Sequence, residues 1–249
     1  MRIYCVNQFR NEQDRIEKWI KYHSLIGVDG YLLYNDNSND DSLSVISNLK
    51  EEGYNIDVIN LTGQDHIDSK DPNIYSSLSL HTRIKNSMND SLITLKKIDN
   101  DDIFIAFIEI DEFIVPELSY DLKEYISEFN DMRLWVPSYD MNIKEITKNF
   151  LIENNETWSD IDRINSGFQG RCKSIIKLNK CGYITCIHNL DFSPCIRTSG
   201  GNFKNNDNNM KAQKEIGLRI NHYRIPPLMD KFNSTNNRIT EILFHYGKL

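Results

Sequence analysis

The first 60 residues alternate between two hydrophobic patterns, and this alternation constrains the fold more than any other feature. Residues 2–9 (RIYCVNQF) and 31–35 (YLLYN) are rich in the branched and aromatic side chains typical of strands. Between them, large side chains recur at the spacing of one helical stripe, at Ile16, Trp19, Ile20 and His23. We expect Asn11 to cap this helix and Gly27 to end it. A strand, a helix and a strand in this order predict a βαβ unit with parallel strands.

The same pattern continues through the first half of the chain. Residues 40–53 form a second helical pattern with Leu43, Ile46 and Leu49 on one face and Gly53 as its end, and residues 55–60 (NIDVIN) follow as a third strand. A longer helix is expected from residue 74 to 98, with an inward face of Leu78, Ile84, Met88, Leu92 and Leu95. Residues 104–117 give a fourth strand. Alternating elements predict an α/β fold with an open, mostly parallel sheet and helices on both faces.

The second half of the chain is less regular. We expect strands at residues 132–137, 173–178, 183–188 and 217–223. The asparagine-rich segment 202–211 has no apolar period and predicts a mobile loop, and a helix is expected after Pro226 and Pro227. No repeat or clear linker divides the sequence, so we expect one domain with an elaborated C-terminal half.

The composition narrows the classes of partner. The chain has 249 residues and a formal net charge of −7, which argues against a general nucleic-acid binder. Its five cysteines form no CxxC pair, so we expect reduced thiols in a cytoplasmic protein. No signal peptide precedes the first strand, and no apolar run approaches the roughly 18 residues of a membrane helix. We therefore expect no transmembrane segment, although a membrane-bound substrate could be reached from the cytoplasmic side.

Residues 104–117 (FIAFIEIDEFIVPE) join a buried-looking apolar run to three carboxylates, at Glu109, Asp111 and Glu112. A carboxylate in an apolar setting costs several kcal/mol unless a positive charge pairs with it. Either the strand emerges into water here, or a cation lies here. Residues i and i+2 of a strand point to the same side, so Glu109 and Asp111 can face one cation. Such oxygen ligands suit Mg²⁺ or Mn²⁺, and the apolar residues 113–115 that follow favour the cation.

Two further polar clusters follow predicted strands, so they should lie with the carboxylates at the carboxyl ends of the parallel strands. Ligands of such sheets bind at these ends. Residues 7–12 (NQFRNE) and 35–41 (NDNSNDD) suit a nucleotide's base and phosphates, although the second cluster can also be a polar turn that caps the next helix. His23 lies on the apolar stripe and is expected in the core or at its edge. His188 and His222 end apolar strands, where an imidazole can complete a metal site or bind phosphate.

Taken together, these motifs resemble the GT-A glycosyltransferases of the family 2 and family 92 type. The pattern consists of NE at 11–12, KWIKYHSLIGVDGYLLYNDNSNDD at 18–41, EIDEF at 109–113, KSII at 173–176, IHN at 187–189 and NHY at 221–223. The resemblance runs from about residue 3 to 231. It implies a GT-A fold, Rossmann-like, with residues 1–116 as the nucleotide-sugar-binding half and residues 117–249 as the acceptor-binding half.

The resemblance also implies an activity: metal-dependent transfer of a hexose, galactose or glucose, from a UDP-sugar to a glycan, with inversion. The asparagine- and lysine-rich loops suggest a bacterial origin, so we expect the acceptor to be a glycan or lipid-linked oligosaccharide of bacterial surface polysaccharide synthesis. The enzyme would then work in the cytoplasm or peripherally at the inner face of the membrane. Two alternatives are a sugar-phosphate nucleotidyltransferase and a non-catalytic nucleotide-sugar-binding module. The nucleotidyltransferase is disfavoured because residues 7–12 contain no glycine.

Individual roles follow from the matched motifs. Asn11, Glu12 and Asp36 match positions that hold the nucleotide, and Lys173 and His188 are further candidates for contact with the nucleotide sugar. Glu109, Asp111 and His222 match the site of Mn²⁺ or Mg²⁺, with Glu109 where the family usually has Asp. An inverting transfer needs a carboxylate base, and the candidates are Asp140, Asp162 and Glu112.

Overall fold

Strands and helices alternate through the first half of the chain, as the sequence predicts. The structure, a computed structural model, describes residues 1–61, 80–98, 102–116, 121–127, 133–140, 167–184, 195–197, 210–213 and 218–222. The first half contains β1 (Arg2–Phe9), α1 (Ile16–Leu25), β2 (Gly30–Asn35), α2 (Ser42–Glu51), β3 (Ile56–Asn60), α4 (Leu80–Lys96), β4 (Ile103–Phe107) and β5 (Glu112–Pro116). It is followed by α5 (Leu122–Ser127), β6 (Arg133–Asp140), β7 (Gly167–Lys177), a 3₁₀ turn (Leu178–Lys180), β8 (Cys195–Arg197), β9 (Met210–Gln213) and β10 (Leu218–His222).

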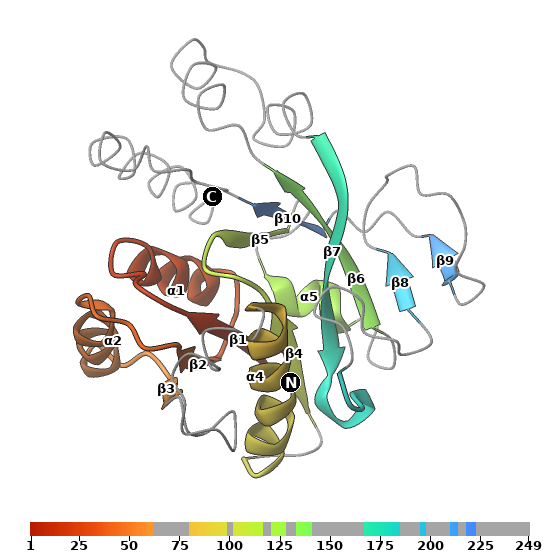
Figure 1. Cartoon of the computed structure of the whole chain (residues 1–249). Coiled ribbons are helices and arrows are strands. Elements are labelled where there is room, and N and C mark those ends of the chain that lie inside the picture. Colours follow the sequence, from red (N-terminus) through yellow and green to blue (C-terminus); the bar gives the residue numbers. More distant parts are fainter. Residues whose placement is uncertain are drawn as a thin grey trace.

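One sheet organises these elements, and its strand order is β3-β2-β1-β4-β7-β6-β10-β5 (Figure 1). The neighbouring strands β3, β2, β1 and β4 are all parallel. β7 runs antiparallel to both β4 and β6, and β5 runs antiparallel to β10. β8 and β9 extend the sheet beside β6 in parallel. The predicted α/β architecture with a mostly parallel sheet is therefore confirmed.

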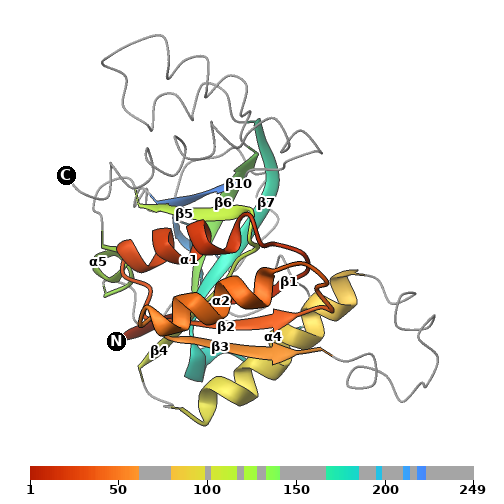
Figure 2. The ribbon, with the colours of Figure 1, turned by 90° about the vertical axis from the view of Figure 1, so that its left-hand side faces the viewer.

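Helices cover both faces of the parallel part, because successive side chains of each strand point to opposite faces. Ile3 and Cys5 of β1 belong to the core beneath α1, α2 and α5, whereas Tyr4 and Val6 pack in the core beneath α4. Figure 2 shows α1 and α2 on one side of β1–β3 and α4 on the other. The thiols of Cys5 and Cys181 are free and buried, as expected of reduced cysteines.

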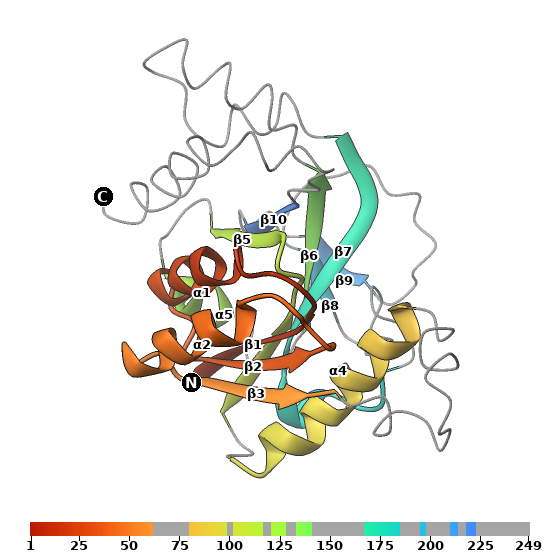
Figure 3. The same cartoon turned by 60° about the vertical axis from the view of Figure 1, so that its left-hand side comes forward.

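The strand β5, at the end of the sheet path, is covered along its outer edge by α1 (Figure 3). Trp19 Nε1 donates to the carbonyl of Glu112 at 2.9 Å, and the Tyr22 hydroxyl donates to the carbonyl of Ile114 at 2.7 Å. The backbone N–H of Ile114 donates to His23 Nε2 at 3.2 Å. Three side chains of one helix thus satisfy backbone groups that an edge strand would otherwise leave unpaired. The expected core position of His23 is confirmed.

Several local predictions need correction. The helix α1 begins at Ile16 after Arg15, and no side chain among the described residues caps it; Asn11 lies earlier, in a left-handed conformation with φ of 56°. Leu43 is 40% exposed rather than inward, although Ile46 and Leu49 are buried. Gly27 and Gly53 do follow their helices, each with φ of 99°. This left-handed conformation is the one that favours glycine after a helix.

The apolar stretch 104–117 contains two strands rather than one. β4 ends at Phe107 and β5 begins at Glu112, and the two lie far apart in the strand order. The helix predicted from residue 74 begins at Leu80 within the described residues, and Met88, Leu92 and Leu95 face the core as expected. Leu78 lies outside the described residues.

In the second half, β6, β7 and β10 confirm three of the four expected strands. The fourth strand was expected at residues 183–188, but residues 183–184 are irregular, and residues 185–188 lie outside the described residues. The last two residues of the expected loop 202–211, Met210 and Lys211, belong to β9, and the other residues of this loop are not described. The helix expected after Pro227 also lies outside the described residues. In the parts of the chain that the structure describes, no helix combines the length and apolarity needed to cross a membrane.

Candidate active site

The acidic residues lie in a tight turn between β4 and β5. The carbonyl of Glu109 accepts from the backbone N–H of Glu112 at 3.0 Å, and the Glu112 carboxylate accepts from the backbone N–H of Glu109 at 2.8 Å. Asn7 of β1 donates its Nδ2 to the carbonyl of Ile108 at 2.6 Å, which ties the start of the turn to the sheet. The expectation that Glu109 and Asp111 share one side of a strand is therefore wrong. The turn, not strand pleating, positions them.

This turn brings Glu109 and Asp111 together with His222 at the end of β10. One ligand atom from each of the three residues lies within 4.8 Å of the others. His222 Nε2 and Asp111 Oδ2 are 3.2 Å apart. Two carboxylates and an imidazole are a donor set that accommodates Mn²⁺ or Mg²⁺, and the carboxylates are only partly buried. The three residues that the sequence assigns to the metal thus fit a divalent cation.

Electrostatics couple His222 to Asp111. Burial lowers the pKa of His222, but the hydrogen bond and the charge of Asp111 outweigh it and raise the pKa to about 9. Burial alone would raise the pKa of Asp111, yet the bond to His222 keeps that pKa below its ordinary value. The pair is therefore an ion pair at neutral pH.

Lys173 of β7 also contacts this turn. Its ammonium contacts the Glu109 carboxylate directly and lies 3.1 Å from Glu112 Oε2. The side chains of Lys173 and Glu112 are 6% and 2% exposed, whereas that of Glu109 is 39% exposed. Burial lowers the pKa of Lys173, but the two carboxylates raise it above its ordinary value, so the ammonium stays charged. Glu112 is therefore buried against Lys173 and offers little surface to an acceptor.

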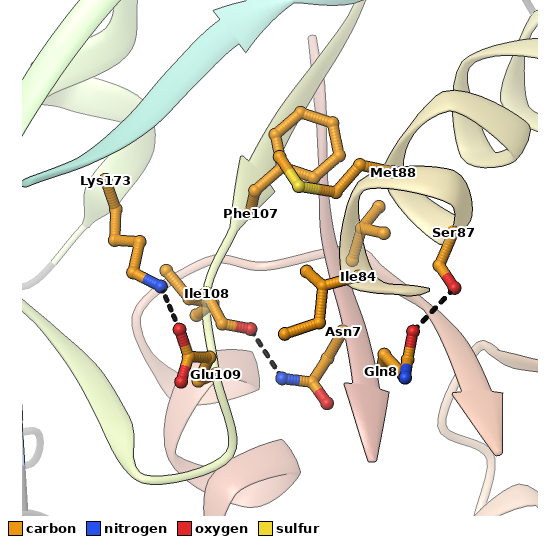
Figure 4. Close-up of a pocket in the computed structure, with 10 residues that line it drawn as sticks. Asn7, Gln8, Ile84, Ser87, Met88, Phe107, Ile108, Glu109 and Lys173 are labelled. Carbon is orange, nitrogen blue, oxygen red and sulfur yellow. Dashed lines mark hydrogen bonds and ion pairs between the residues drawn. The ribbon is translucent and has the colours of Figure 1, made fainter. Parts of the chain in front are cut away.

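A recess opens beside this turn, between the end of β1 and the helix α4. It holds about 380 Å³ of empty space, part of it open to solvent, and its wall includes Asn7, Gln8, Ser87, Glu109 and Lys173 (Figure 4). The Oδ1 atom of Asn7 is buried and has no hydrogen-bond partner among the described residues. A buried polar atom without a partner is costly, so this oxygen suits a donor group of a bound ligand.

The two polar loops predicted to share the sheet edge are hydrogen-bonded to each other. The backbone N–H of Asn11 donates to Ser38 Oγ at 3.0 Å, and Asn11 Oδ1 accepts from the N–H of Asn39 at 2.8 Å. The N–H of Glu12 donates to Ser42 Oγ at 2.8 Å. Many of these polar groups therefore join the two loops, as the alternative of a polar turn at residues 35–41 predicts.

Asp36 and Glu12 occupy partly or fully buried positions in this region. Asp36 is 2% exposed and accepts from Gln8 Nε2 at 3.0 Å and from Arg83 Nε at 3.1 Å. Glu12 pairs with Arg15 at 2.7 Å. Burial raises the pKa of Glu12 to about 7, against the lowering effect of Arg15 and with a raising contribution from Asp111. Glu12 thus lies within electrostatic reach of the metal candidates.

The remaining candidates are only partly placed. The backbone of Asp140, the last residue of β6, lies beside His222 in register. Asp162 and His188 lie outside the described residues. Sequence reasoning did not single out Arg83, nor the pairing of Lys173 with Glu112. A single arginine in a helical pattern gives no signal, and an ion pair between residues 61 positions apart is not visible in spacing.

The comparison with protein families identifies the family of this chain. Residues 2–241 match glycosyltransferase family 92. The chain belongs to glycosyltransferase family 92. This confirms the family indicated by the motifs.

Individual relatives are distant or cover little of this family 92 chain. A glycosyltransferase family 92 protein of Ricinus communis is 43% identical over 53 residues, which are 21% of this chain and only a tenth (10%) of that protein. Glucosyl-3-phosphoglycerate synthase from Mycobacterium tuberculosis, in complex with phosphoglyceric acid, is 13% identical, with a TM-score of 0.36 over 72% of this chain and 58% of that one. Its complex with Mn²⁺, uridine diphosphate and glucosyl-3-phosphoglycerate has a TM-score of 0.37 at the same identity and coverage. Likeness at this level is too weak to transfer ligands.

Proposed function

We propose that this protein is a metal-dependent glycosyltransferase that transfers a hexose, galactose or glucose, from a UDP-sugar to a glycan acceptor with inversion. The observation that carries the proposal is the convergence of Glu109, Asp111 and His222 beside a recess at the carboxyl ends of the parallel strands. Family membership supplies the class of reaction, and the donor set supplies the reason for a metal.

The metal would be held by Glu109, Asp111 and His222, as Mn²⁺ or Mg²⁺. A cation bound there would offset the negative charge of the departing diphosphate. In the protein itself, His222 is paired with Asp111 and Lys173 with Glu109. These contacts hold the carboxylates in place before any ligand arrives, and a cation would have to displace the Lys173 ammonium from Glu109 and the proton from His222 Nε2.

The nucleotide would bind in the adjoining recess. A carboxylate that reaches a base N–H or a ribose hydroxyl is a common means of recognising uridine, and we infer this role for Asp36 and Glu12, with Asn11 as a further contact. The Oδ1 of Asn7, which has no hydrogen-bond partner in the part of the chain that the structure describes, adds an acceptor in the wall of the recess. Lys173 also borders the recess, so its ammonium can contribute to holding the diphosphate.

For the base that deprotonates the acceptor hydroxyl, we propose Asp140. Its backbone lies next to that of His222 at the ends of two parallel strands, β6 and β10. Glu112 is buried against Lys173 and is better suited to support the turn. Asp140→Asn should lower kcat while leaving the KM for the donor and the affinity for Mn²⁺ unchanged. An unchanged kcat would return the role to Asp162.

We extend the proposal to the biological setting: a lipid-linked oligosaccharide or another glycan of bacterial surface polysaccharide synthesis, reached in the cytoplasm or at the inner face of the membrane. The net charge of −7 fits a neutral glycan better than a nucleic acid. Sedimentation with vesicles that contain a lipid-linked acceptor, against vesicles without it, tests the membrane part.

The test of the activity is a panel of nucleotide sugars incubated with the protein in Mn²⁺ or in EDTA, with release of the nucleoside diphosphate followed. We expect slow hydrolysis of one UDP-hexose with Mn²⁺ and none with EDTA. The anomeric configuration of the product, read by NMR, reports inversion or retention. Release of pyrophosphate from a nucleoside triphosphate and a sugar phosphate would refute the proposal.

A further inference from the structure

The ammonium of Lys173 contacts two carboxylates that differ in their surroundings. Glu112 is buried with it, whereas Glu109 is substantially exposed and belongs to the group that fits a metal. Figure 4 shows the Lys173 side chain directed at Glu109 across the edge of the recess. A single buried lysine needs only one carboxylate to balance its charge, so the second contact calls for an explanation.

We propose that Lys173 and Glu112 are positioning residues of the metal site, and that the Lys173 ammonium and a divalent cation compete for the Glu109 carboxylate. This inference rests on the proposed function, because it requires that a cation binds at Glu109. In the protein without a cation, Lys173 holds Glu109 in place. When a cation takes Glu109, Lys173 remains paired with Glu112.

The role of Glu112 follows from its two contacts. Its carboxylate accepts from the backbone N–H of Glu109 at 2.8 Å, which fixes the turn, and it lies 3.1 Å from Lys173 Nζ. Without that charge, Lys173 could leave Glu109 only as an unpaired buried cation, which is strongly unfavourable. Glu112 is therefore what makes Glu109 available to a metal, although it does not touch the metal itself.

Two variants separate this role from a merely structural one. Glu112→Gln keeps a carbonyl oxygen for the N–H of Glu109 but removes the charge, so Lys173 should hold Glu109 more tightly and the affinity for Mn²⁺ should fall about tenfold. Adding Lys173→Met removes the competing ammonium, so the double variant should regain the wild-type affinity or exceed it. A structural role alone predicts that the second substitution never improves binding.

The experiment is a titration of the full chain with Mn²⁺ alone, in which the free ion is measured by electron paramagnetic resonance. Asp111→Asn serves as the variant that loses the site. Lys123→Met is the matched control, because Lys123 also forms a partly buried ion pair, 2.6 Å from Asp29 Oδ1. This pair lies at the amino ends of the parallel strands, away from the acidic turn. We expect Lys123→Met to bind Mn²⁺ like the wild type.

The outcomes are distinguishable. If the wild type binds Mn²⁺, Asp111→Asn does not, and the double variant binds no better than Glu112→Gln, the metal site stands and the competition is refuted. If the wild type binds no Mn²⁺, the metal site and the competition both fail. Should the double variant with Met not fold, as judged by circular dichroism, Glu112→Gln with Lys173→Gln gives the same comparison.

Discussion

The buried imidazole of His23 predicts a specific loss of stability in acid. The N–H of Ile114 donates to Nε2, so that nitrogen must be unprotonated, and Nδ1 carries the proton toward the carbonyl of Trp19 at 2.8 Å. A second proton would set two N–H groups against each other in a fully buried site. Burial accordingly lowers the pKa of His23 to about 3, despite the opposing bond to Trp19.

The size of the effect follows from linkage. The unfolded chain binds a proton at His23 with a pKa of about 6.5, whereas the folded chain does not until far lower pH. Stability from the neutral ring is therefore present above the unfolded pKa and is lost as the pH falls below it. Between pH 7 and pH 5, this loss amounts to about 2 kcal/mol of the free energy of unfolding.

Urea unfolding, followed by tryptophan fluorescence at pH 7, 6 and 5, measures this loss of the free energy of unfolding. His23→Gln should be less stable than the wild type at pH 7, but its loss between pH 7 and pH 5 should be about 2 kcal/mol smaller. Tyr22→Phe is the control, because it removes a neighbouring bond to β5 without removing a group that titrates in this range. If His23→Gln and the wild type lose the same stability between these pH values, the assignment of a neutral buried imidazole is wrong.

Three further predictions concern the site and the backbone. Asp111→Asn should lower Mn²⁺-dependent turnover about 100-fold or more with little change in melting temperature, and full activity would refute the metal assignment. Arg83→Met, which removes a partner of buried Asp36, should raise the donor KM about tenfold while Mn²⁺ binding stays constant; an unchanged KM would exclude Arg83 from the donor site. Gly53→Ala should cost about 1 kcal/mol in urea unfolding, and Gly27→Ala about 2 kcal/mol, because both have φ of 99° but only a Cβ at Gly27 would come within 2.7 Å of a carboxylate oxygen. Equal losses would contradict that difference.

Sequence periodicity predicted the elements whose determinants are local. The stripe of Ile16, Trp19, Ile20 and His23 gave α1 and its buried face, and all four are buried. The prediction that Leu43 faces inward was wrong because residues three positions apart differ in direction around the helix axis by about 60°. Leu43 is two such steps from Leu49, so it lies on the flank of α2 rather than on its inward face.

Errors arose where a distant segment decides the structure. Asn11 looks like a helix cap, but its side chain accepts from the backbone of Asn39 in the neighbouring loop. The break after Phe107 cannot be inferred from an apolar run, because it is set by the pairing of β5 with β10. Glu109, Asp111 and His222 do lie close together, as the family resemblance implied, but a turn rather than a strand brings the two carboxylates together.

The pairing of Asp111 with His222 also has a consequence for the order of folding. The two residues are 111 positions apart, whereas β1, β2 and β3 join segments that are close in sequence. Closing so long a loop is entropically costly and slows the contacts that depend on it. We therefore expect β1, β2 and β3 to pair early and the acidic turn to meet His222 only in a late step. Lys173, which comes from a nearer strand, can neutralise Glu109 in the meantime.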